Sequence, residues 1–173
     1  MPDLKAIPDE TKWKLAAQCA ALLPLLYGHV FRPVVGSAYD EHEQEIWLEL
    51  ANISSDIVRS LKLPARNAPE IAESIRTVNA ILFGPDFKDE VIEVGDDGTV
   101  LVIRRCPFLL EGGGLGSPAE KMFHRCMVFT LALQNRINPG FESRFVRAMC
   151  MGDRQCEIKI GPAPADKQKP VEK

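Results

Sequence analysis

The chain has 173 residues, 46% of them hydrophobic and 26% charged, with a formal net charge of −3 at pH 7. This length fits one domain with a substantial core, and the mildly acidic balance gives no electrostatic reason to expect nucleic acid or an anionic membrane as partner. Five cysteines, an odd number, argue against a fully paired secreted framework.

The N-terminal region gives no sign of export. Its first ten residues, MPDLKAIPDE, are polar and acidic and lack a signal-peptide pattern. The longest apolar run, residues 15–31, is interrupted by Gln18, Pro24 and His29, so it is too short and broken to span a bilayer. We therefore expect a cytoplasmic protein that has no membrane partner.

A helix capped by Asp9 is predicted to run through Tyr27, with Pro24 at a kink or at its end. The sequence FRPVVGS, at 31–37, then favours a loop. The predicted helix is apolar on several faces, which favours burial or contact with a second copy, as in a homodimer.

Two further helices are predicted in the first half of the chain. The first starts at Ser37 or Asp40 and continues to about Leu61 with an apolar stripe along one side. The next spans about 69–83 and ends at Gly84, which Pro85 follows.

Beyond Gly84 the hydrophobic period changes to that of strands. In VIEVGDDGTVLVIRRC, Asp-Asp-Gly lies between two β-branched runs, which predicts a hairpin with strands at about 89–95 and 98–105. A flexible connection follows, whose GGGLG run lacks the Lys-Ser/Thr of a phosphate loop. Ser117 and Pro118 then start a helix that is predicted to end at about Arg136.

A second hairpin is predicted in FESRFVRAMCMGDRQCEIKI, and the tail at 162–173 is rich in proline and lysine and predicted to be disordered. The order is therefore α-α-α-β-β-α-β-β. Strands joined by tight turns are antiparallel, so we expect a single α+β domain over residues 1–161, with helices packed on a four-stranded sheet.

Four of the five cysteines lie in the second half of the chain. Cys106 follows the second strand, Cys126 lies inside the fourth helix, and Cys150 and Cys156 flank the turn of the second hairpin. The gaps of 19, 23 and 5 residues match no short-range metal motif. If the fold brings them together, four thiolates suit zinc or an iron–sulfur cluster. The alternative is four buried free thiols, and the spacing leaves both open.

Three arginines lie near these cysteines in sequence. Arg105, Arg125 and Arg147 lie close to them in sequence, and their positive charge would lower cysteine pKa values. His124 points about 200° away from Cys126 on a helix, so it is expected to be structural or at the surface. Cys19, on the apolar first helix, is expected to be a packing residue.

Residues 100–161 carry a resemblance to a known family. The residues are RRCPF at 104–108, Cys126, INP at 137–139 and, above all, CMGDRQCEI at 150–158. This region resembles the family that includes the 4-vinyl reductase domain and the L-2-amino-thiazoline-4-carboxylic acid hydrolase-like proteins. The resemblance implies an α+β fold related to small-ligand-sensing and trafficking-complex domains.

The resemblance also implies a ligand set. Some relatives look to bind zinc through cysteines that match Cys126, Cys150 and Cys156, with a glutamate where this chain has Arg147. Cys106 would then replace the missing glutamate, and an all-cysteine set makes an iron–sulfur cluster as suitable as zinc.

Three functions are compatible with this reading. The first is a cytoplasmic metal-binding protein that binds a small organic ligand as an accessory or sensor protein. The alternatives are a small hydrolase acting on a cyclic C–N or C–S substrate such as a thiazoline carboxylate, which the resemblance implies, and a cluster-based redox protein. The sequence gives no catalytic residues.

Overall fold

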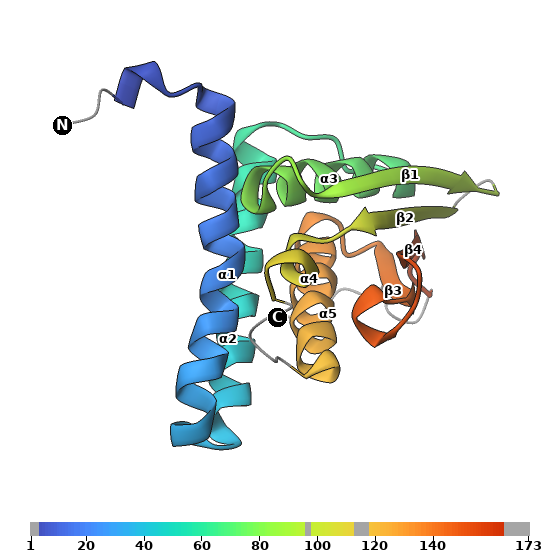
Figure 1. The fold of residues 1–173 in the computed structure, drawn as a ribbon. Helices are drawn as coiled ribbons and strands as arrows, with labels where there is room; N and C mark the ends of the chain where they lie inside the picture. The colour runs from blue at the N-terminus through green and yellow to red at the C-terminus, as the bar shows by residue number, and fades with distance from the viewer. Residues whose placement is uncertain (1–3, 96–97, 113–117, 165–173) are drawn as a thin grey trace.

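The computed structural model describes residues 4–95, 98–112 and 118–164 of the chain. It confirms the α+β class, with helices packed on a four-stranded antiparallel sheet (Figure 1). The elements are α1 (Asp9–Val35), α2 (Ala38–Ser60), α3 (Ala68–Phe83), β1 (Lys88–Val94), β2 (Gly98–Arg105), α4 (Pro107–Gly112), α5 (Ala119–Ile137), β3 (Phe141–Arg147) and β4 (Cys156–Pro162), with short 3-10 helices η1 (Leu4–Ala6) and η2 (Met149–Met151).

The sheet has the strand order β1-β2-β4-β3, so the two hairpins pair through β2 and β4 at its centre. Leu101 of β2 lies opposite Ile158 of β4, and both side chains are fully buried against the helices. Helices α3 and α5 contact the sheet, while α1 and α2 pack on them from the side away from it (Figure 1). The core therefore lies between the sheet and these helices.

Helix α1 is longer than the sequence predicted. It continues through Pro24 and Pro33 to Val35, so the expected loop at 31–37 is helical for most of its length. A proline inside a helix costs one backbone hydrogen bond, but tertiary packing on one face can offset this cost. Here Ala21 and Leu25 are fully buried against the core. Gly36, with φ of 70°, ends the helix.

By length and composition, α1 could cross a membrane, although core helices of other proteins pass the same test. The helix is continuous at Pro24, and the expectation that Gln18, Pro24 and His29 leave the apolar run too broken to span a bilayer stays a prediction.

The remaining helix and strand predictions are close to the structure. Asn67 caps α3 by accepting a hydrogen bond from the backbone N–H of Glu70 at 2.9 Å, and Gly84 follows the helix with φ of 86°. The connection after Cys106 begins with the short helix α4 instead of a loop. The predicted cap Ser117, residues 113–116 of the GGGLG run and the tail at 165–173 lie outside the described residues.

Candidate functional site

The structure brings all four cysteines of the second half of the chain to one place. Cys106, Cys126, Cys150 and Cys156 line a common cavity of about 20 Å³. They come from four different segments: the residue that follows β2, the interior of α5, η2 and the first residue of β4. The pairing of β2 with β4 explains the convergence, because it sets Ile103 opposite Cys156 and so carries Cys106 to the same end of the sheet.

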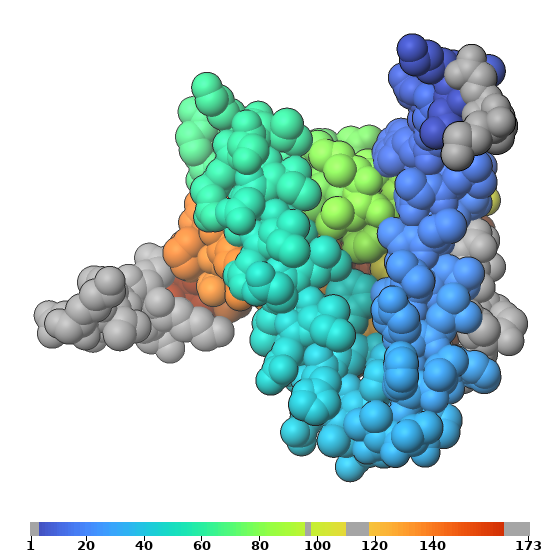
Figure 2. Space-filling view, turned by 90° about the vertical axis from the view of Figure 1, so that its left-hand side faces the viewer, coloured from blue at the N-terminus to red at the C-terminus, as the bar shows by residue number. Residues whose placement is uncertain are grey.

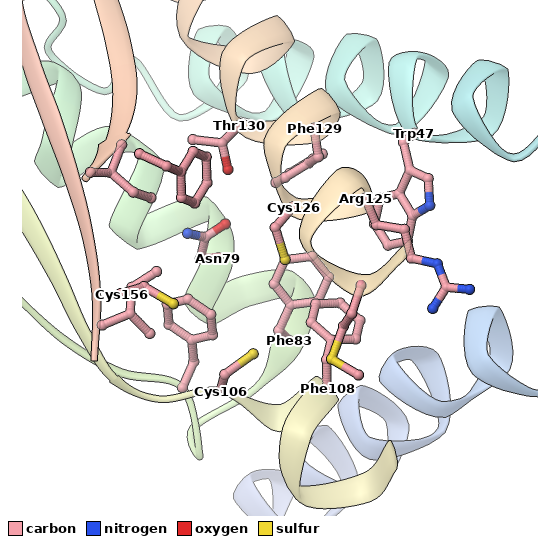
Figure 3. A pocket seen from close by; sticks show the side chains of 15 residues that line it. Trp47, Asn79, Phe83, Cys106, Phe108, Arg125, Cys126, Phe129, Thr130 and Cys156 are labelled. Atoms are coloured by element: carbon pink, nitrogen blue, oxygen red, sulfur yellow. The ribbon is translucent and has the colours of Figure 1, made fainter. Parts of the chain in front are cut away.

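The sulfur atoms surround this cavity without forming a finished metal site. Figure 3 shows the side chains of Cys106, Cys126 and Cys156 directed toward a shared space. Within residues 4–95, 98–112 and 118–164, however, no three His, Cys, Asp or Glu side chains are arranged as metal ligands. The sulfur of Cys156 instead accepts a hydrogen bond from the backbone N–H of Met149 at 3.2 Å.

Burial raises the pKa of every thiol in the group. Removal from water raises the pKa of Cys106 to about 11 and that of Cys126 well above its usual value. The pKa values of Cys150 and Cys156 are raised by the same cause. Without a metal, the four thiols are therefore protonated at neutral pH, and a metal would have to displace their protons.

The nearby arginines do not bring the thiol pKa values below their ordinary value, as the sequence suggested they would. Arg105 faces Asp86, with 3.9 Å between its Nη2 and the carboxylate, and Arg147 donates to Glu157 at 3.0 Å. Arg125 does favour the thiolate of Cys126, but burial outweighs its effect. Each of the three arginines has a carboxylate partner, and the side chains of Arg105 and Arg147 are exposed to solvent.

A second, mostly apolar cavity of about 50 Å³ adjoins the cysteines. Cys106, Cys126 and Cys156 line both cavities. The rings of Phe83 and Phe108 meet edge to face in its wall, with 4.9 Å between their centroids. Its aromatic lining is Trp47, Phe83, Phe87, Phe108, Phe129 and Phe145. A molecule in this cavity would therefore contact the thiols and several aromatic rings at once.

Besides Arg125, the polar side chains of Asn79 and Thr130 line the aromatic cavity. Asn79 of α3 is 5% exposed and Thr130 of α5 is 6% exposed. Figure 3 places both side chains beside the cavity. Their amide and hydroxyl groups could bind a polar group of a ligand or an ordered water.

Sequence reasoning missed Asn79 and Thr130. The available signal was Asn79 itself, a polar residue within the apolar stripe of α3 formed by Ile71, Ile75 and Val78. Cys19, which was expected to be a packing residue, is exposed on α1 and far from the other cysteines in sequence. His124 is half-buried on α5, and it does not line either cavity.

Comparison with known proteins gives a likeness of fold. No protein-family model matches the chain, and no curated protein matches it in sequence. Among solved structures, it is similar to a trafficking protein particle complex subunit 3 from Naegleria fowleri, covalently bound to palmitic acid. The TM-score is 0.57 at 15% identity, and the match covers 84% of this chain and 96% of that one. At this identity the likeness concerns the fold alone.

Proposed function

We propose that this chain is a cytoplasmic metal-binding protein that binds a small organic ligand and works as an accessory or sensor protein. Cys106, Cys126, Cys150 and Cys156 would hold one zinc ion or one iron–sulfur cluster. The observation that carries the proposal is the common cavity, to which four segments far apart in sequence each contribute one thiol.

The donor set fits a metal that prefers sulfur. Four thiolates are the ligands of structural zinc sites and of iron–sulfur clusters, and the surrounding side chains are apolar. Because the sulfurs surround the cavity without converging, binding requires the cysteine side chains to turn inward. A bound metal would supply a link between α5 and both hairpins, so its binding energy would add to the stability of the fold.

The shared walls of the two cavities support a sensor or accessory role. Cys106, Cys126 and Cys156 would touch both the metal and any small group of a ligand that enters the aromatic cavity. Binding of a ligand there would therefore act directly on the positions of the metal ligands. A site with four protein ligands leaves no open position for catalysis, which favours binding over hydrolysis.

We also infer that the protein forms a homodimer through α1. Leu23, Tyr27, Val30 and Val34 follow one another at helical spacing, and all are exposed, Val34 to 82%. An exposed apolar stripe of this length is typical of a protein–protein interface.

The metal is tested by purifying the protein without oxygen and measuring zinc, iron and sulfide together with the visible spectrum. We expect about one zinc per chain, or about four irons with absorption of a cluster. Cys150→Ser should lose most of the metal and lower the melting temperature. Cys19→Ser is the matched control, because Cys19 is exposed on α1, and it should retain the metal. A wild-type protein without metal, or equal metal in both variants, would contradict the proposal.

A further inference from the structure

We propose that Cys156 and Cys150 form a pair that senses hydrogen peroxide: the oxidant attacks Cys156, Cys150 closes a disulfide with it, and the metal is released. This inference rests on the proposed function and names what the sensor responds to and how its metal site is regulated. The disulfide and the metal are measured separately, so the two proposals fail in different ways.

Cys150 and Cys156 lie at the two ends of one short turn. The sulfur of Cys156 accepts a hydrogen bond from the backbone N–H of Met149 at 3.2 Å, and Met149 directly precedes Cys150. Asp153 holds the turn closed. Its carboxylate accepts from the backbone N–H of Ala148 at 2.8 Å, and its own N–H donates to the Ala148 carbonyl at 3.3 Å. Both cysteines also line the cavity of about 20 Å³, so a small movement of the turn joins the two sulfurs.

This turn is the part of the candidate site that moves at least cost. Residues 151–154 are exposed, and Met151 is exposed to 51%. Cys126, in contrast, is held inside α5, and Cys106 is held between β2 and α4. Closing the short loop between Cys150 and Cys156 orders little chain that the turn has not already ordered. Cys150 is therefore the partner of Cys156 in the disulfide.

The aromatic cavity gives a small oxidant access to Cys156. Its volume of about 50 Å³ is room for a few water molecules, and hydrogen peroxide has only two oxygen atoms. Asn79 and Thr130 line this cavity together with Cys156 (Figure 3). Their amide and hydroxyl groups are suited to hydrogen-bond the peroxide oxygens. A ring needs roughly 150 Å³, so a bulky oxidant does not fit.

The larger opening of the molecule does not lead to the thiols. A groove of about 260 Å³ lies between α1, α2 and α3, and Figure 2 shows the surface hollowed between α1 and α2. None of the four cysteines is among the described residues that line it. Trp47 and Phe83 line both the groove and the aromatic cavity, so their side chains lie between the two spaces. Access to Cys156 therefore favours a small oxidant.

The reaction takes two electrons from the two cysteines. The thiolate of Cys156 attacks one oxygen of hydrogen peroxide, the O–O bond breaks, and a sulfenic acid forms as hydroxide leaves. The thiolate of Cys150 then attacks this sulfur, forms the disulfide and displaces a second hydroxide. One peroxide is thus reduced to two hydroxide ions for each disulfide. Cys106 and Cys126 are then the only thiolates left, and two ligands do not complete a four-ligand site.

The test adds hydrogen peroxide to protein purified without oxygen. Peptide mass spectrometry identifies the disulfide, and the metal that stays with the protein is measured after desalting. We expect a Cys150–Cys156 disulfide, loss of most of the metal in step with it, and recovery of the metal-bound form with dithiothreitol and added metal. Dimedone present during the oxidation should label Cys156 and not Cys150. The wild type is used because serine at either position would itself remove metal.

A bulkier oxidant tests the route through the cavity. tert-Butyl hydroperoxide is the matched oxidant, and Cys19 is an internal reference because it is exposed on α1. The rate of oxidation of Cys156 relative to that of Cys19 should fall about tenfold when this oxidant replaces hydrogen peroxide. Thr130→Val removes the hydroxyl at nearly constant volume and should slow oxidation of Cys156. Ile92→Ala, at an exposed position of β1, is its control and should react as the wild type does.

Four results would overturn the peroxide-sensing pair: a disulfide between any other two cysteines, dimedone on Cys150 in place of Cys156, loss of metal without the disulfide, or an unchanged rate ratio with the bulkier oxidant. An unoxidised pair in protein that keeps its metal would also overturn it and would leave the metal site standing. A Cys150–Cys156 disulfide formed in protein purified without metal would contradict the metal site instead.

Discussion

At the scale of single residues, the main property of the thiols in the candidate site is their removal from water. Cys126 lies in the interior of α5, and the pKa of its thiol is raised well above the usual value. The pKa of Cys106 is raised to about 11, and in both cases desolvation is the largest cause. A protein that keeps these thiols buried gains stability when they are neutral and loses it when they ionise without a metal.

This gives a prediction for pH. Cys106 has a folded-state pKa of about 11 against an ordinary value of 9.0, so the folded state binds its proton more tightly than the unfolded state does. Its contribution is complete below pH 9.0 and is lost as pH rises toward about 11. We expect metal-free protein to lose stability across this window, as measured by urea unfolding at a series of pH values.

Lysine and tyrosine side chains also titrate at high pH, so the wild type must be compared with a variant that lacks the Cys106 thiol. Metal-free Cys106→Ser should lose less stability than the wild type across the same window. The metal-bound wild type should also be resistant, because its thiolates are already ionised and ligated. An identical loss in wild type and Cys106→Ser would show that burial of this thiol is not the cause.

At the scale of elements, α1 has an apolar stripe that packing within one chain leaves exposed. Its Ala21 and Leu25 face the core, while Val30 and Val34 stay exposed, as do Leu23 and Tyr27 at the groove between α1, α2 and α3. Contact with water disfavours such a stripe, and a second copy of α1 offers an equally apolar surface to cover it.

We predict that the wild type is a dimer in light scattering at micromolar concentration and that Val30→Glu with Val34→Glu is a folded monomer. Both positions are exposed in one chain, so the charges should cost little within it. As a control, Ile46→Glu changes an exposed apolar residue of α2 outside this stripe. A wild type that is monomeric, or that partitions into lipid vesicles in place of dimerising, contradicts the homodimer.

The elements with strong local signals were predictable. Asp-Asp-Gly between β-branched runs gave the first hairpin to within a residue, and the cap and stop signals located α3. The continuation of α1 to Val35 was not, because Pro24 and Pro33 oppose helix locally and the packing that outweighs them comes from distant segments.

The sequence predicted the part of the candidate site that follows from the pairing of the two hairpins. Three of its cysteines lie at the ends of strands or in their connection, so pairing of the two hairpins was enough to bring them together. The cluster of Arg125 and Glu43 joins residues 82 positions apart, and no pattern in either helix signals the contact. Asn79 stood out only as a polar residue in an apolar stripe.

For the whole molecule, the candidate metal site lies where its layers meet. The four cysteines belong to the central strands, to their connection and to α5, which packs between the sheet and α2 (Figure 1). A metal there would tie both hairpins to the helical layer.

The central claim is that one metal is held by these four thiolates. X-ray absorption at the edge of the metal, on protein purified without oxygen, counts the ligand atoms and identifies them. We predict a first shell made of sulfur alone, with about four atoms at about 2.3 Å if the metal is zinc. A shell of nitrogen and oxygen, or one that is unchanged when Cys126 and Cys156 are both replaced by serine, would contradict the account.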